Sequence, residues 1–202
     1  MLGKTHMAVG IAATLAVTQP ETIPEMILAV GGGALGALIS DIDVGTSESH
    51  RDADKITALS VVVVLVMFAL DYFFNAGIIN RVVRSSGYGR IIAGILLFIG
   101  ICAFGKEQPH RSFMHSFLAM LLLCFAIGMV WENAVIYFAV GFLSHLATDV
   151  FNRKKVRVLY PLQGGVSLGL FHANGLANHL FFVLGSAAAV LEIILFSIRL
   201  LR

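Results

Sequence analysis

The stretch at residues 179–198 reads HLFFVLGSAAAVLEIILFSI, an apolar run with a single formal charge at Glu192. A helix needs about 20 such residues to cross the hydrocarbon core of a bilayer. Two further runs, at 56–74 and 113–130, have a similar length and composition. These three runs predict membrane-spanning helices.

The composition of the chain agrees with a membrane protein. Hydrophobic residues make up 58% of its 202 residues, charged residues 13%, and the mean hydropathy is +0.88. Average proteins have about 25% charged residues. We therefore expect one all-α integral membrane domain over residues 1–202, because helices satisfy their own backbone groups in lipid. The net charge of +2 is too small to favour a nucleic-acid partner.

Four shorter apolar runs bring the expected number of helices to about seven. They lie at 7–18, 25–40, 91–105 and 134–148, separated by segments rich in Gly, Pro and polar residues. Runs of this length are also compatible with half-spanning helices. The predicted fold is a polytopic transmembrane helical bundle of about seven helices.

Polar residues that bind metals gather on one predicted face of this bundle. If each helix crosses once, the N-terminus and the segments 41–55, 105–112 and 150–178 share a face, and all seven histidines fall on that side. Nine Lys and Arg residues lie there against five on the opposite face. The positive-inside rule then predicts that the histidine-bearing face is cytoplasmic.

The sharpest local motif is SHLATD at residues 144–149. The spacing of His145 and Asp149, four residues apart, stacks an imidazole and a carboxylate on one helical face. Both groups are ligands for zinc, manganese or iron. The alternative is a hydrogen bond between them that pins two membrane helices together.

A second motif, HRSFMHS at residues 110–116, precedes an apolar run. The start of a helix there would offer free N–H groups to a phosphate, helped by Arg111 and Ser112, while His110 and His115 bind metal. Ser112 is alternatively a plain N-cap.

A third motif, SDID at residues 40–43, ends the second apolar run. Asp41 and Asp43 reach one site together only if the helix unwinds there. One carboxylate would then bind metal while the other orients a histidine or accepts a proton. The glycines at 31–33 and Gly36, in the preceding run, predict a close helix-packing face.

These motifs, together with TH at 5–6, GFLSHLATD at 141–149 and YPL at 160–162, resemble the membrane-bound metal-dependent hydrolases of bacteria and archaea. One bacterial branch of that family is described as LexA-regulated and associated with the inner membrane, and its motifs are similar to those of zinc-dependent phospholipase C. Val44 and Gly45 stand where family members often have His-Pro, so His50 is a candidate substitute ligand. The resemblance implies a multi-pass protein of the cell inner membrane.

We therefore expect a metal-dependent hydrolase that acts on a membrane lipid or another amphiphilic phosphoester through metal-activated water. Zinc is the first expected metal and manganese the second. Asp41 and Arg111 are the predicted catalytic residues; His172 and His179 are expected to lie outside the metal site. The competing interpretation is a non-enzymatic membrane protein, either a metal or proton transporter or a scaffold with a structural cluster. The predicted metal-site residues are His6, Asp43, His110, His115, His145 and Asp149.

Overall fold

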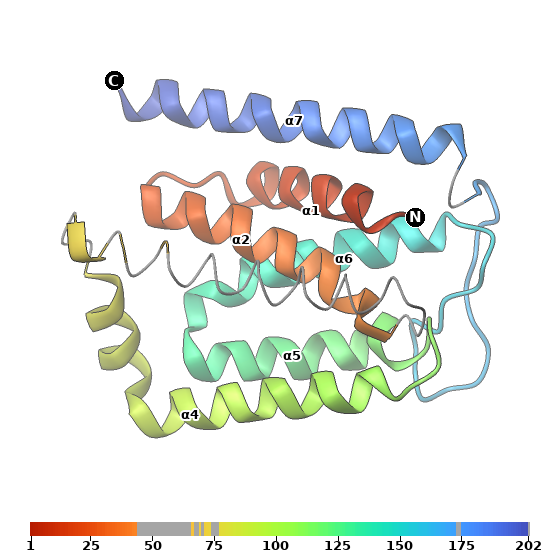
Figure 1. The fold of residues 1–202 in the computed structure, drawn as a ribbon, viewed down its shortest axis with the longest axis horizontal. Coiled ribbons are helices and arrows are strands. Elements are labelled where there is room, and N and C mark those ends of the chain that lie inside the picture. Colours follow the sequence, from red (N-terminus) through yellow and green to blue (C-terminus); the bar gives the residue numbers. More distant parts are fainter. Residues whose placement is uncertain (44–65, 67–68, 70, 74–76, 173–174, 202) are drawn as a thin grey trace.

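The computed structural model describes residues 1–43, 66, 69, 71–73, 77–172 and 175–201, and it confirms the predicted all-α fold (Figure 1). The predicted helix at 56–74 lies mostly outside the described residues. Short 3₁₀ turns occur at Ser40–Asp43 (η1), Phe113–His115 (η2) and Glu132–Ala134 (η3). The α-helices are Gly3–Thr18 (α1), Ile23–Ile39 (α2), Ile78–Lys106 (α4), Phe117–Val130 (α5), Val135–Val150 (α6) and Leu176–Leu200 (α7).

The helices run side by side, with α1, α2 and α6 at the centre (Figure 1). α7 packs on α1, and α4 packs on α5. The N-terminus, η1, η2 and the connection from α6 to α7 lie at one end of the bundle, whereas the C-terminus lies at the other end. Successive helices run in opposite directions from α1 to α2 and from α4 to α7, as the sequence predicts for these parts of the chain (Figure 1).

Four helical segments among the described residues are long and apolar enough to cross a membrane. They are Ile23–Asp43, Ile79–Lys106, Glu132–Val150 and Leu176–Leu200. α5 is shorter than predicted: it has 14 residues, because the first residues of the apolar run at 113–130 form η2 and its cap. Its length falls below the roughly 20 residues of a full span.

The fourth helix is longer than the sequence predicts. The polar segment at 75–90 is expected to be a connection, yet α4 begins at Ile78. The helix bends at Gly87, whose φ of 70° and ψ of 154° are not helical. Glycine adopts this left-handed φ without strain, so the polar part becomes a separate helical arm at an angle to the apolar part (Figure 1).

Glycines allow the three central helices to approach closely, as the sequence predicts for 31–36. The Cα of Gly36 faces the backbone carbonyl of Phe138, and that of Gly141 faces the carbonyl of Gly33. A methyl group at either position would overlap the opposite backbone. This contact brings α2 and α6 together along their length and so aligns their ends, where the polar residues lie.

The connection between α6 and α7 runs from Phe151 to Gly175 and folds over the end of the bundle. Backbone hydrogen bonds of 2.9 Å join Val156 and Val166 in both directions. Asn152 and Phe171 form a second bridge. These contacts hold the segment 152–171 as an ordered cover beside the polar cluster.

Candidate metal centre

The predicted site residues converge at the end of the bundle that carries the N-terminus. His6 lies in the first turn of α1, Asp41 and Asp43 in η1, His110 and Arg111 between α4 and η2, His115 in η2, and His145 and Asp149 in the last turns of α6. Except for His110, Arg111 and Asp41, these side chains are almost completely buried. Three overlapping groups have ligand atoms close enough for a metal ion: His6, His145 and Asp149; Asp41, His115 and His145; Asp43, His110 and His115.

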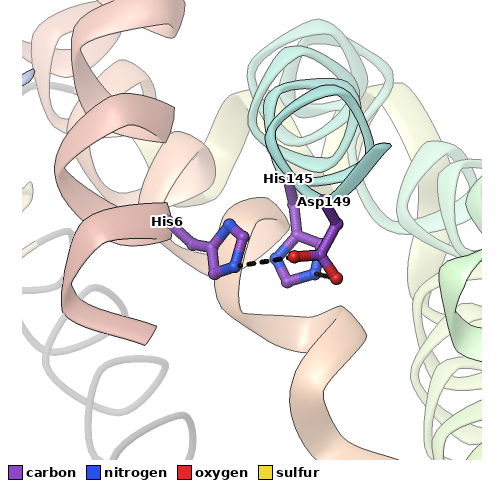
Figure 2. Close-up of side chains that lie close together, drawn as sticks. All are labelled: His6, His145 and Asp149. Carbon is purple, nitrogen blue, oxygen red and sulfur yellow. Dashed lines mark ion pairs between the residues drawn. The ribbon is translucent and has the colours of Figure 1, made fainter. Parts of the chain in front are cut away.

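His145 is held in one orientation by the backbone of α2. Its Nδ1 lies 2.6 Å from the carbonyl oxygen of Ala37. A carbonyl only accepts hydrogen bonds, so Nδ1 carries the proton and Nε2 keeps its lone pair. Nε2 faces Asp149, one turn along the same helix, at 3.9 Å (Figure 2). The one-face geometry predicted from the spacing of these two residues is therefore present.

His6 stacks on His145, with 3.9 Å between ring centroids (Figure 2). Its Nδ1 lies 2.9 Å from the hydroxyl of Thr148, and its Nε2 lies 3.4 Å from Oδ1 of Asp149. Oδ1 also accepts a hydrogen bond of 2.9 Å from the N-terminal ammonium. α1 thus contributes one imidazole nitrogen to the cluster.

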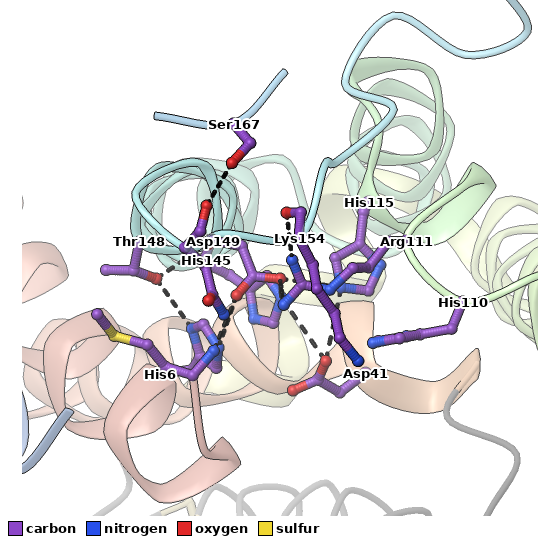
Figure 3. Close-up of polar contacts among 12 residues, drawn as sticks. His6, Asp41, His110, Arg111, His115, His145, Thr148, Asp149, Lys154 and Ser167 are labelled. Atoms are coloured by element: carbon purple, nitrogen blue, oxygen red, sulfur yellow. Dashed lines mark hydrogen bonds and ion pairs between the residues drawn. The ribbon is translucent and has the colours of Figure 1, made fainter. Parts of the chain in front are cut away.

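His115 and His145 each direct Nε2 toward the carboxylates of Asp41 and Asp149, between α6, η1 and η2 (Figure 3). His115 Nε2 lies 3.5 Å from Asp41 Oδ1 and 3.6 Å from Asp149 Oδ2. His145 Nε2 lies 3.8 and 3.9 Å from the same two oxygens. Neighbouring ligands of a tetrahedral ion with bonds of about 2.1 Å are roughly 3.4 Å apart. The four nitrogen–oxygen spacings are close to this value, and Asp41, His115 and His145 form a group whose ligand atoms all lie within 4.8 Å of one another.

Asp43 contacts two histidines through their Nδ1 atoms. Its Oδ1 lies 2.8 Å from Nδ1 of His110, and its Oδ2 lies 3.4 Å from Nδ1 of His115. Oδ2 also accepts a 3.3 Å hydrogen bond from the N–H of Arg111. Both histidines keep Nε2 away from this carboxylate, which is the arrangement of a carboxylate that orients a metal ligand. The expected unwinding at this point does not occur: α2 continues into the tighter 3₁₀ turn η1, from which Asp41 and Asp43 still reach different nitrogen atoms.

The cluster contains buried imidazole nitrogens that have no hydrogen-bond partner among the described residues. Nε2 of His6, both ring nitrogens of His115 and Nε2 of His145 are buried and lack a hydrogen bond within the described structure. A buried polar atom left unpaired costs about 1–3 kcal/mol. Three such imidazoles beside two carboxylates fit a divalent metal, which would satisfy their lone pairs together.

The charge state of His115 follows from its neighbours. Burial disfavours its charged form, but the carboxylates of Asp41 and Asp43 on either side prevail and raise its pKa to about 9. In the metal-free protein both ring nitrogens of His115 are therefore protonated at neutral pH. A metal ion that binds His115 must displace one of these protons.

Arg111 links the cluster to a neighbouring pocket. One terminal nitrogen pairs with Oδ2 of Asp149 at 3.0 Å, and the other donates to the carbonyl of Lys154 at 2.8 Å (Figure 3). The pocket beside it has a volume of about 500 Å³. Its lining residues are His110, Arg111, Lys154, Lys155, Arg157, Gly164 and Gly165.

The helix-start anion site predicted near Ser112 is not formed. α5 begins at Phe117, and its cap is Ser116, whose hydroxyl accepts from the N–H of Ala119 at 3.2 Å. Ser112 bonds instead to the carbonyl of Pro109. The intervening η2 turn moves the helix start past His115, so Arg111 faces the pocket and not a helix terminus.

Some residues of the site escape sequence reasoning. The carbonyl of Ala37 and the hydroxyl of Thr148 orient His145 and His6, and neither residue type signals a metal site. His172 and His179 are exposed and belong to none of the three groups among the described residues. His50, the candidate substitute ligand, lies outside the described residues.

Comparisons with known proteins agree with a membrane location. The family model described as YdjM inner membrane protein matches residues 1–200. "Uncharacterized protein YvsG" of Bacillus subtilis (strain 168) is 28% identical over 177 residues, which covers 87% of this chain and 82% of the relative. No solved structure matches the chain. The family match and the apolar helices together identify a membrane protein.

Proposed function

The chain belongs to the YdjM inner membrane protein family, and we propose that it is a metal-dependent hydrolase acting at the membrane surface on a lipid or other amphiphilic phosphoester. The observation that carries the proposal is the group Asp41, His115 and His145, whose ligand atoms lie within 4.8 Å of one another, with Oδ2 of Asp149 at 3.6 and 3.9 Å from the two imidazole Nε2 atoms. Two imidazoles and two carboxylates favour zinc, with manganese second.

The distances suggest an exchange of roles between the two aspartates relative to the sequence-based assignment. Asp41 faces two imidazole Nε2 atoms and is the better ligand. Asp43 bonds to His110 and to the N–H of Arg111, so it is the better positioning residue. Asp149 presents Oδ1 to His6, which offers a second metal position beside the first. The proposed ligands of the first ion are Asp41, His115, His145 and Asp149.

A bound divalent ion supplies a Lewis acid and lowers the pKa of a water molecule toward neutrality. Arg111 lies where it stabilises negative charge on a phosphoryl oxygen. His110 lines the pocket, is partly exposed and is held by Asp43, so it is placed to protonate a leaving group. In the overall reaction a bond forms between the water oxygen and phosphorus, the ester P–O bond breaks, and the proton ends on the leaving oxygen.

The position of the cluster supports an enzyme over a transporter. Transport sites lie near the bilayer midplane on broken helices. These residues instead lie at the ends of α1, α2 and α6, at one end of the bundle (Figure 1), and His110 and Arg111 also line the neighbouring pocket. Such a site meets a headgroup at the membrane surface.

Metal analysis and turnover of purified variants test this proposal. His145→Ala is expected to lose its metal and all phosphoester hydrolysis. Arg111→Ala is expected to keep its metal while turnover falls about 100-fold, which is typical for loss of one electrostatic stabiliser. His172→Ala is the matched control, because His172 is exposed and outside the cluster. Equal metal content in wild type and His145→Ala would leave a structural polar cluster as the better account.

A further inference from the structure

The pocket beside the cluster has three cationic side chains that the proposed metal centre does not use. Lys154, Lys155 and Arg157 come from the connection between α6 and α7 and line the cavity together with Arg111. Asp149 neutralises Arg111. Within the described part of the chain, no carboxylate pairs with the other three, and no acidic residue lines the pocket. An anionic occupant is therefore strongly favoured.

Contacts within the connection between α6 and α7 hold the pocket residues in place. Gly165 packs against Lys155 and the carbonyl of Val156, where a side chain would be crowded. Arg157 donates to the carbonyls of Pro161 and Leu162 at 3.2 and 3.1 Å, and its buried Nε has no hydrogen-bond partner. Arg157 thus links the pocket to the next turn of the connection by hydrogen bonds, and its Nε–H has no acceptor among the described residues.

That turn is apolar and exposed. Leu159 and Leu162 are 59% and 66% exposed, and Leu168 and Leu170, further along, are 55% and 58% exposed. All four lie outside the candidate membrane spans, so crossing the bilayer does not account for their exposure. Exposed leucines beside a cationic pocket are suited to the boundary between headgroups and acyl chains.

From this juxtaposition we infer that the connection between α6 and α7 is a recognition element for an anionic membrane lipid whose headgroup is a phosphomonoester. Its phosphate occupies the pocket of Lys154, Lys155 and Arg157, and its acyl chains lie against the exposed leucines. A phosphomonoester carries about −1.5 to −2 charges at pH 7, which matches three unpaired cations better than a zwitterionic headgroup does. The inference rests on the proposed function only for the role of this lipid as substrate.

Binding to metal-stripped protein tests the inference apart from catalysis. Full-length protein in detergent and EDTA is titrated with phosphatidic acid or phosphatidylcholine in mixed micelles, and separately with inorganic phosphate. The variant is Lys154→Gln with Lys155→Gln, since Arg157 also holds the backbone. Arg153→Gln is the matched control, because Arg153 is an exposed cation of the same connection that does not line the pocket.

Wild type is expected to bind phosphatidic acid at least tenfold more tightly than the double variant, because the variant removes two of the cations that line the pocket. Arg153→Gln should stay within about twofold of wild type, and phosphatidylcholine should bind at least tenfold more weakly. Equal binding of the two lipids, or an unchanged double variant, would overturn the inference. Inorganic phosphate binding as tightly as phosphatidic acid would overturn the lipid as occupant. Metal content measured on untreated protein reports on the hydrolase proposal separately.

Discussion

Asp41 and Asp43 are two residues apart and contact different nitrogen atoms, on opposite sides of the His115 ring. Asp41 lies between the Nε2 atoms of His115 and His145, whereas Asp43 contacts Nδ1 of His110 and of His115. In the 3₁₀ turn η1, with about three residues per turn, residues i and i+2 point roughly 120° apart, so the two carboxylates reach different atoms.

This difference predicts unequal effects of two matched substitutions. Asp41→Asn should abolish zinc binding, because it removes a ligand charge. Asp43→Asn should weaken zinc binding by about 10- to 100-fold, as is typical for a residue that orients a ligand. Competition titration with a fluorescent zinc chelator measures both. Equal affinities of the two variants would contradict the proposed roles.

Metal affinity should depend strongly on pH. The pKa of His115 is about 9 in the metal-free protein because Asp41 and Asp43 favour its charged form over the penalty of burial. Below that pH the metal must displace a proton, so zinc affinity should fall about tenfold per pH unit as pH decreases. Zinc titrations at pH 8 and pH 6 should thus differ by about 100-fold or more. An unchanged affinity would exclude His115 as a ligand.

At the scale of elements, the site depends on how closely α2 and α6 pack. His145 hydrogen-bonds the carbonyl of Ala37 across this contact, and a methyl at Gly36 would overlap the carbonyl of Phe138. Gly36→Ala should therefore destabilise the protein by about 1–3 kcal/mol and reduce metal content. Thermal unfolding in detergent and metal analysis measure the two effects.

Gly100→Ala is the matched control for this substitution. Gly100 lies within helix α4, and a methyl group added to it would meet no heavy atom of the described residues within 4 Å. Alanine in a helix interior is favoured over glycine by about 1 kcal/mol, so this variant should be as stable as wild type or more stable. Loss of metal from both Gly36→Ala and Gly100→Ala would show that the loss is not specific to the packing of α2 on α6.

At the scale of the whole molecule, the His/Asp cluster and the C-terminus lie at opposite ends of the bundle (Figure 1). The Lys and Arg excess of nine to five, with the positive-inside rule, predicts a cytoplasmic cluster and a C-terminus outside. Reporter fusions at Gly164 and after Arg202 test this topology. A cytoplasmic signal after Arg202, or an external signal at Gly164, would contradict it.

The sequence by itself determined the all-α membrane fold and the identity of the polar residues that meet at one end. Apolar runs are local features, and alternating crossings bring every second helix end to the same side. The pairing of His145 with Asp149 was also predictable, because residues four apart share a helical face.

Only the tertiary structure decided the start of α4 at Ile78, the delayed start of α5 at Phe117 and the separate orientations of Asp41 and Asp43. It also assembled the cationic pocket from Arg111 and residues more than 40 positions later. Turn geometry and hydrogen bonds such as that from His145 to Ala37 depend on neighbours distant in sequence. Side-chain direction at a helix end is set by these contacts, because the regular helical pattern stops there.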